Sequence, residues 1–263
     1  MKFKHKISKG SRFNQIYIPK EVEEDFEVGD LVEVKLLKKK TKIYYSKNLP
    51  KLSDFKENIV KKIFSTLEQF NEIKQIFVIG SFLTQKINYN DIDIILITNK
   101  KELEEVAYDK LTDKINLKFH IISISEDNFS LLQETCPLTN NMIYYYLSNK
   151  NFNPPNKRKI DKNHIKFLIM LPEDLLEIKT NSHVFYDSIR RLITIRKFLK
   201  NEDLDPIKIN KELELTLGTF TFSALKDNEI IDTKIIEKLR DIIKNELNNI
   251  NKLIQNEQNK NHS

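Results

Sequence analysis

The apolar residues near the middle of the chain fall into two short runs separated by a polar segment. The first run is Ile76–Ile79, and the second extends from Ile92 to Ile97. Short runs rich in β-branched residues are typical of buried strands. We therefore predict two strands of a buried sheet here, and a third strand at 115–124, where apolar and polar residues alternate.

Longer segments carry apolar residues at intervals of three and four, which is the period of a helix. Ser53 is expected to cap the first of these helices. Its apolar side consists of Phe55, Ile59, Val60, Ile63, Phe64, Leu67 and Phe70. We predict further helices at 101–113, 138–147, 182–200 and 233–255. The tyrosines at 144–146 fit either a helix packed on the sheet or a surface that stacks a base.

The first fifty residues show a different pattern, with shorter periods and a tight turn. Residues 13–19 alternate as a strand and stop at a proline, and residues 20–26 fit a short amphipathic helix. Gly29-Asp30 is a turn dipeptide, and a second strand is expected at 31–36. We expect Tyr44 and Tyr45 to extend this small sheet.

Two proline-containing segments divide the chain. Pro50 ends the N-terminal module, and the paired prolines at 154–155 follow an asparagine-rich stretch that disfavours regular structure. We predict domains at 1–50, 51–152 and 153–263. The predicted fold class is α+β, with a small N-terminal β-hairpin module, a mixed sheet with helices, and a C-terminal all-α bundle.

The charge and cysteine content narrow the possible partners and compartment. The formal net charge is +6, and residues 1–50 hold eleven lysines and one arginine against seven acidic residues. A basic pole of this kind favours phosphate-bearing partners, although solvated lysines are the simpler explanation. The single cysteine, Cys136, excludes an internal disulfide. With no signal peptide or long apolar run, we expect a cytoplasmic protein without membrane contact.

The ends of the two central runs carry the candidate chemistry. Gly80 and Ser81 close the first run, while Asp91 and Asp93 lie at the start of the second. Alternate strand residues share a face, so the two carboxylates would project together at about 6–7 Å spacing. Two such oxygen ligands can hold Mg²⁺, and a Gly-Ser turn can hold phosphate oxygens. The alternative is an ordinary Asp-x-Asp turn at a strand end.

The order Gly-Ser, spacer, Asp-x-Asp resembles the signature of the nucleotidyltransferase superfamily that includes DNA polymerase β, particularly its minimal members. The resemblance implies a nucleotidyltransferase-type mixed sheet. It also implies that Gly80 and Ser81 bind an NTP and that Asp91 and Asp93 hold Mg²⁺ as catalytic residues. The third carboxylate of that family is missing, and His120 occupies its place. His120 is either a catalytic base or a strand histidine bonded to a neighbour.

The N-terminal order of strand, Ile-Pro-Lys, short helix, Gly-Asp and strand resembles the AbrB-like swapped-hairpin domains. The matching residues are Ile18, Pro19, Lys20, Gly29, Asp30 and Val32. The resemblance implies an intertwined homodimer that contacts DNA or RNA through basic hairpins. The candidate phosphate contacts are then Lys4, Lys6, Lys9 and Arg12. The acidic short helix and a spacing about two residues shorter than the family pattern weigh against DNA contact.

Three functions from different classes fit these patterns. The first is an Mg²⁺-dependent enzyme that transfers a nucleoside monophosphate from an NTP to a protein or nucleic-acid acceptor. The second is a DNA-binding regulator or antitoxin-like protein with a catalytically impaired nucleotidyltransferase fold. The third is an interaction protein that dimerises through its C-terminal helix. In the first case Arg190, Arg191, Arg196 and Lys197 are further candidates for nucleotide phosphate contacts.

Overall fold

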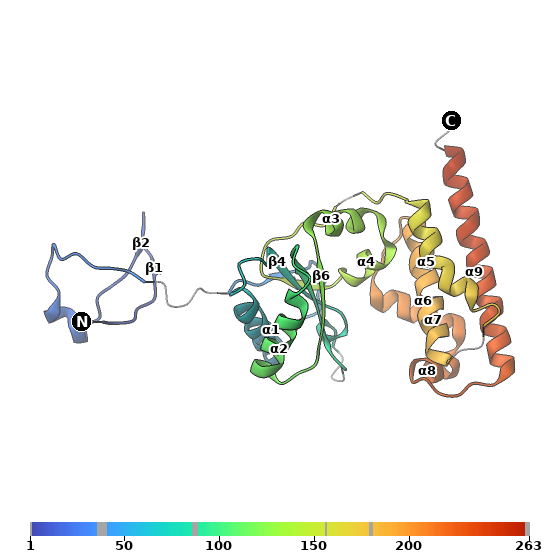
Figure 1. Ribbon diagram of the computed structural model, residues 1–263, viewed down its shortest axis with the longest axis horizontal. Coiled ribbons are helices and arrows are strands. Elements are labelled where there is room, and N and C mark those ends of the chain that lie inside the picture. The colour runs from blue at the N-terminus through green and yellow to red at the C-terminus, as the bar shows by residue number, and fades with distance from the viewer. Residues whose placement is uncertain (1, 36–40, 86–88, 156, 179–180, 261–263) are drawn as a thin grey trace. The chain divides into compact units, whose positions relative to one another are not determined.

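The computed structural model describes residues 2–35, 41–85, 89–155, 157–178 and 181–260. The chain divides into two compact units, residues 1–40 and residues 41–263 (Figure 1). Within the described residues, none of the helices combines the length and apolar character needed to cross a bilayer.

The first unit contains a short hairpin and a short 3₁₀ helix. Strand β1 (Ser8–Lys9) pairs antiparallel with β2 (Asn14–Gln15), and η1 (Lys20–Asp25) follows. The strand predicted at 13–19 is therefore much shorter, and residues 31–35 form no strand. None of the residues 2–35 is buried. A strand needs a paired neighbour to be stable, and none of the described residues pairs with residues 31–35.

The second unit is built on a five-stranded mixed sheet. Its strand order is β3 (Tyr44–Tyr45), β7 (Tyr146–Ser148), β4 (Gln75–Ile79), β5 (Ile92–Ile97) and β6 (Phe119–Ile124). Only β5 and β6 run parallel; the other neighbours are antiparallel. The expectation that Tyr44 and Tyr45 extend the N-terminal sheet is wrong, because they pair with β7 instead.

Helices cover both faces of this sheet (Figure 1). On one face, α1 (Asp54–Leu67) and α2 (Leu103–Ile115) pack on one set of alternate strand residues. On the other face, Phe129 of α3 (Glu126–Thr135) packs on the remaining set, such as Phe77 and Ile95. The predicted cap of α1 is confirmed, since the Ser53 hydroxyl accepts from the Lys56 backbone N–H. Phe55, which was predicted to lie on the apolar side of this helix, is instead exposed.

The predicted helix at 138–147 is wrong in its second half. Helix α4 (Pro137–Met142) is short, and the chain then enters β7. Tyr145 and Tyr146 are both buried, and their hydroxyls donate to Asp205 Oδ1 and to the Phe152 carbonyl, each at 3.0 Å. Aromatic residues favour strands when sheet neighbours are present. These two buried rings leave no free face for stacking a base.

The C-terminal part is a helical bundle with a core of its own. It comprises α5 (Lys162–Asp174), α6 (Ser182–Leu199), α7 (Pro206–Leu217), α8 (Thr219–Lys226) and α9 (Thr233–Lys260). Helix α6 contacts each of the other four. Helix α9 carries an apolar stripe that is buried against its own bundle, formed by Leu239, Ile243, Leu247, Ile250 and Ile254. That stripe is therefore not available to dimerise in the way the third function requires.

Candidate active site

The strand register brings the predicted site residues into one row across the sheet. Asp93 of β5 lies opposite Ile79 of β4 on one side and opposite His120 of β6 on the other. Gly80 follows Ile79 directly, so the Gly-Ser turn begins beside Asp93. Pairing of three consecutive sheet neighbours thus places the turn, the carboxylate and the imidazole at one end of the strands.

Gly80 and Asp93 are in direct contact. Gly80 has φ +81° and ψ −160°, a conformation accessible essentially to glycine alone. A Cβ atom at this position would lie 2.2 Å from Asp93 Oδ2. The backbone therefore approaches the carboxylate as closely as it does only because residue 80 has no side chain. Ser81 then starts the 3₁₀ turn η2 (Ser81–Leu83), with its side chain exposed.

The other oxygen of Asp93 is bonded to His120. His120 Nδ1 lies 3.0 Å from Asp93 Oδ1, and the side-chain exposures are 59% for His120 and 29% for Asp93. An ionised carboxylate can only accept a hydrogen bond, so Nδ1 carries the proton, and in the neutral imidazole the lone pair is then on Nε2. His120 can therefore be both a strand histidine bonded to its neighbour and a base, because the two roles use different ring nitrogens.

The electrostatic environment of Asp93 favours a nearby cation. Burial raises the pKa of the Asp93 carboxyl above its ordinary value; the His120 hydrogen bond opposes this rise, and the negative charge of Asp91 adds to it. Asp91 itself is partly buried and immediately precedes β5. A divalent ion beside the two carboxylates would remove this repulsion.

The donor set is small for a metal site. Across the described residues, no group of three or more His, Cys, Asp or Glu side chains is placed to hold a metal ion. Asp91 and Asp93 provide the carboxylate oxygens that Mg²⁺ prefers, while His120, in the place of a third carboxylate, is engaged with Asp93. Asp91 and Asp93 therefore fit Mg²⁺ as two carboxylate ligands.

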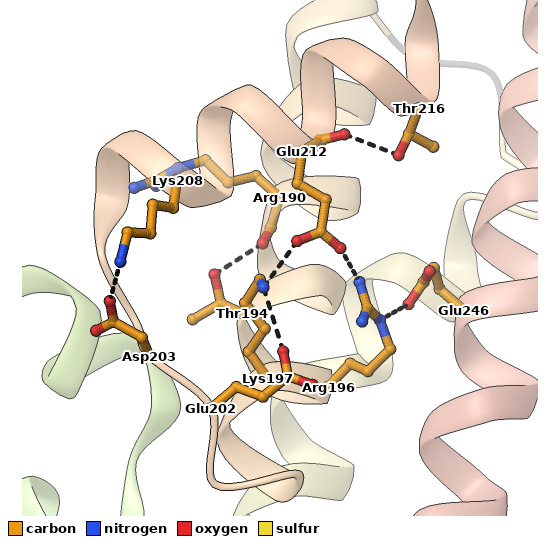
Figure 2. A network of polar contacts seen from close by, with 10 residues as sticks. All are labelled: Arg190, Thr194, Arg196, Lys197, Glu202, Asp203, Lys208, Glu212, Thr216 and Glu246. Atoms are coloured by element: carbon orange, nitrogen blue, oxygen red, sulfur yellow. Dashed lines mark hydrogen bonds and ion pairs between the residues drawn. The ribbon is translucent and has the colours of Figure 1, made fainter.

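The basic residues of α6 were expected to contact nucleotide phosphates, but they bond to other residues of the protein (Figure 2). Arg196 bonds to Glu212 and, at 2.8 Å, to Glu246, while Lys197 lies 2.8 Å from Glu212 and 3.2 Å from Glu202. These contacts join α6 to α7 and α9. Arg190 bonds to the side chains of Asn210 and Asn141, and Arg191 bonds to the Leu168 carbonyl. These side chains stabilise the bundle, so the expectation that they reach nucleotide phosphates is not supported.

The four predicted nucleic-acid contacts lie in the other unit. Lys4, Lys6, Lys9 and Arg12 are all exposed, with Lys9 in β1 and Arg12 in the turn that follows. Around them, apolar side chains of the same unit are also exposed. These are Ile7, Phe13, Ile16, Tyr17, Ile18, Val28, Leu31, Val32 and Val34.

Lys56 is a residue of this region that the sequence patterns did not single out. It lies in the first turn of α1, and its Nζ donates to the Thr84 carbonyl at 2.8 Å, just after the Gly-Ser turn. A signal was present in the sequence, since Lys56 falls on the same helical side as Ile59, Val60 and Ile63. A lysine on an otherwise apolar stripe indicates a buried charge with a partner.

Comparison with known proteins agrees with this geometry. Residues 61–151 match the family model described as "Polymerase beta, Nucleotidyltransferase", and this range includes Gly80, Ser81, Asp91, Asp93 and His120. Neither the curated proteins nor the solved structures gave a significant match. The segment that carries the glycine turn and the paired aspartates is therefore similar to the polymerase β family, and this match supports a nucleotidyltransferase domain at residues 61–151.

Proposed function

We propose that the chain is an Mg²⁺-dependent nucleotidyltransferase, which transfers a nucleoside monophosphate from an NTP to a hydroxyl of a protein or nucleic acid. The observation that carries the proposal is the contact between Gly80 and Asp93 Oδ2. It holds a carboxylate against the start of the turn that would receive the triphosphate. A merely structural Asp-x-Asp turn would not need a glycine in this backbone conformation opposite the carboxylate.

Each residue has a role that follows from its chemistry. Asp91 and Asp93 would hold Mg²⁺, which when bound neutralises charge on the triphosphate and the leaving pyrophosphate. The backbone N–H groups after Gly80 and the Ser81 hydroxyl would bind phosphate oxygens. The close approach at Gly80 keeps these two sites adjacent.

His120 is suited to accept the proton of the attacking hydroxyl. Its Nδ1 is engaged by Asp93, so Nε2 is the atom that would take the proton. The acceptor oxygen would then form a bond to the α-phosphorus, and the bond between the α-phosphorus and the bridging oxygen would break. Pyrophosphate would leave with the electron pair of that bond.

The proposal is tested with the full chain and each of the four α-³²P-labelled NTPs, with RNA or the protein itself as acceptor. We expect Mg²⁺-dependent label on one acceptor. Asp93→Asn should lower the rate about a hundredfold or more, because charge stabilisation by a bound metal is worth several kcal/mol. Asp109→Asn, an exposed acid on α2, is the control and should be unchanged. Absence of label with every nucleotide and acceptor would reject the enzyme.

A second function is favoured by the surface of residues 2–35. Four exposed basic side chains lie in a segment that buries none of its own apolar residues. A segment of this size generally needs a partner to build a core. We therefore also propose that residues 1–40 form an AbrB-like homodimer that binds DNA or RNA through Lys4, Lys6, Lys9 and Arg12.

Salt dependence distinguishes this binding from a solvated basic surface. Affinity for a DNA duplex or an RNA should fall steeply with salt, with a logarithmic slope of about 0.9 per duplex phosphate contact and about 0.7 on a single strand. Replacing all four basic residues with glutamine should flatten that slope. The matched control replaces four exposed lysines of the other unit: Lys61, Lys101, Lys166 and Lys238. Binding that does not depend on salt, or that survives the first replacement, would reject the nucleic-acid interface.

A further inference from the structure

Lys56 carries its charge at a position where a cation is unfavourable. Only 9% of its surface is exposed, and it shares a helix side with buried Ile59 and Val60. It also lies in the first turn of α1, where the helix dipole disfavours positive charge. Burial lowers the pKa of its ammonium group. A cation retained against both effects indicates a role that an apolar residue of the same length would not fill.

The contacts of Lys56 join the two ends of the segment between β4 and β5. Near the start of the segment, Nζ donates to the Thr84 carbonyl and lies 5.3 Å from the centre of the Phe82 ring. Near its end, Nζ lies 5.4 Å from the centre of the Tyr89 ring. Both distances are within the range of cation–π attraction, about 6 Å. Phe82 and Tyr89 also pack edge to face, with ring centres 5.0 Å apart.

The two ends that Lys56 joins are the ends that carry the site. Thr84 follows Ser81 within one 3₁₀ turn, as its backbone N–H and its hydroxyl both donate to the Ser81 carbonyl. Tyr89 is two residues before Asp91. Asp93 is fixed by the strand register and by His120, whereas Asp91 precedes β5 and is not among the described residues that pair in that register.

We infer that Lys56 is a positioning residue for nucleotidyl transfer, holding Tyr89 beside Phe82 and Thr84 so that Asp91 stays next to Asp93. The inference rests on the proposed function of Asp91 and Asp93. Lys56 acts through these neighbours and does not contact substrate, since its ammonium is buried and directed at a carbonyl. Its contribution is the placement of the second metal ligand.

The test uses the full chain with two substitutions at this position and one control. Lys56→Met keeps the length and apolar stem and removes the charge, while Lys56→Arg keeps the charge. Lys61→Met is the matched control, because Lys61 is on the same helix and its side chain is 52% exposed. Within the described residues its one ion pair is with Glu57. Mn²⁺ binding without nucleotide is measured by electron paramagnetic resonance, and hydrogen exchange is measured for peptides covering residues 80–93.

We expect Lys56→Met to speed exchange in that peptide and to weaken Mn²⁺ binding about 10–100-fold, as loss of an outer-shell partner does. Lys56→Arg should restore most of the affinity, and Lys61→Met should match the wild type. Tyr89→Leu provides an independent variant, and it should weaken Mn²⁺ binding while Lys56 is intact. It also serves if Lys56→Met fails to fold.

Two results would overturn the inference. In the first, Lys56→Met and Tyr89→Leu speed exchange but leave Mn²⁺ affinity unchanged, so the cluster is only structural. In the second, neither measurement changes. Asp93→Asn separates this outcome from failure of the proposed function. If Asp93→Asn also leaves Mn²⁺ affinity unchanged, the aspartates are not the metal site, and both proposals are rejected.

Discussion

Gly80 combines two requirements that a side chain would violate. Its φ of +81° strains any other residue, and the space of a Cβ atom is taken by Asp93 Oδ2. Gly218 shares only the first requirement. Its φ is +79°, but a Cβ atom added there would have no described atom of a packed neighbour within 4 Å. The two glycines therefore separate the cost of the backbone conformation from the cost of losing the carboxylate contact.

We expect Gly80→Ala to lower the free energy of unfolding by more than Gly218→Ala, for which backbone strain alone predicts about 1–3 kcal/mol. Gly80→Ala should also abolish label transfer, because Asp93 must move to make room for the methyl group. Chemical denaturation and the labelling assay check these two results. A Gly80→Ala protein with wild-type transfer would show that Asp93 need not lie against the turn.

The helices of the bundle are joined by a partly buried network of charges. Arg196 is 14% exposed and connects Glu212 of α7 with Glu246 of α9 (Figure 2). Burial alone would raise the pKa of Glu212, but hydrogen bonds from Lys197 and Arg196 hold it below its ordinary value. The network thus stabilises the folded bundle through the ionised form of Glu212.

We expect Arg196→Met to lower the free energy of unfolding by about 1.5–3 kcal/mol, as loss of hydrogen bonds to a charged group does. Lys208→Met removes an exposed, solvent-screened pair with Asp203 and should lower the free energy of unfolding by less. Urea denaturation of both variants at neutral pH provides the comparison. Equal costs would show that partial burial does not strengthen the Arg196 contacts.

The same network predicts a dependence on pH with a defined sign. Because the pKa of Glu212 is lowered by folding, its contribution is present above the unfolded value, near 4.5, and is lost as pH falls through the folded value. The stability difference between wild type and Arg196→Met should therefore shrink as pH falls below about 4.5. Denaturation curves between pH 7 and pH 3 measure it. A difference that stays constant would exclude Glu212 as the linked group.

At the scale of the whole molecule, the bundle and the sheet of residues 41–263 are joined by specific polar contacts. Asn141 of α4 donates to the Leu204 carbonyl at 2.8 Å and accepts from Arg190 at 2.9 Å. Tyr145 donates to Asp205, and burial and that contact raise the pKa of Tyr145. Among the described residues, the buried cores of this unit are formed by side chains between Leu52 and Ile254.

Removal of residues 2–40 should therefore leave the thermal unfolding of 41–263 nearly unchanged while abolishing self-association. The physical reason is that, in the proposed homodimer, a second copy would cover the exposed apolar residues of the first unit. Sedimentation velocity and calorimetry check both results. Leu31→Lys in the full chain is a milder variant that should weaken the dimer in the same direction. A truncated chain that remains dimeric would place the interface elsewhere.

The sequence determined the local elements and the chemistry. Period and capping predicted α1, and the ends of the predicted strands located Gly80, Ser81, Asp91 and Asp93, because local spacing records which residues share a face. Other features depend on contacts between distant segments. The fold was needed to show that Tyr44 pairs with β7, that the helix predicted at 138–147 ends at Met142 so that Tyr146 starts β7, and that Arg196 forms ion pairs.

Tertiary structure alone likewise decided three features of the site: the contact of Gly80 with Asp93, the hydrogen bond between His120 and Asp93, and the burial of Lys56. They join residues from three strands and a helix, and sequence spacing carries no record of which segments meet. The residue types thus follow from the chain alone, whereas the site they form follows from the register of β4, β5 and β6, which sets the distances between them.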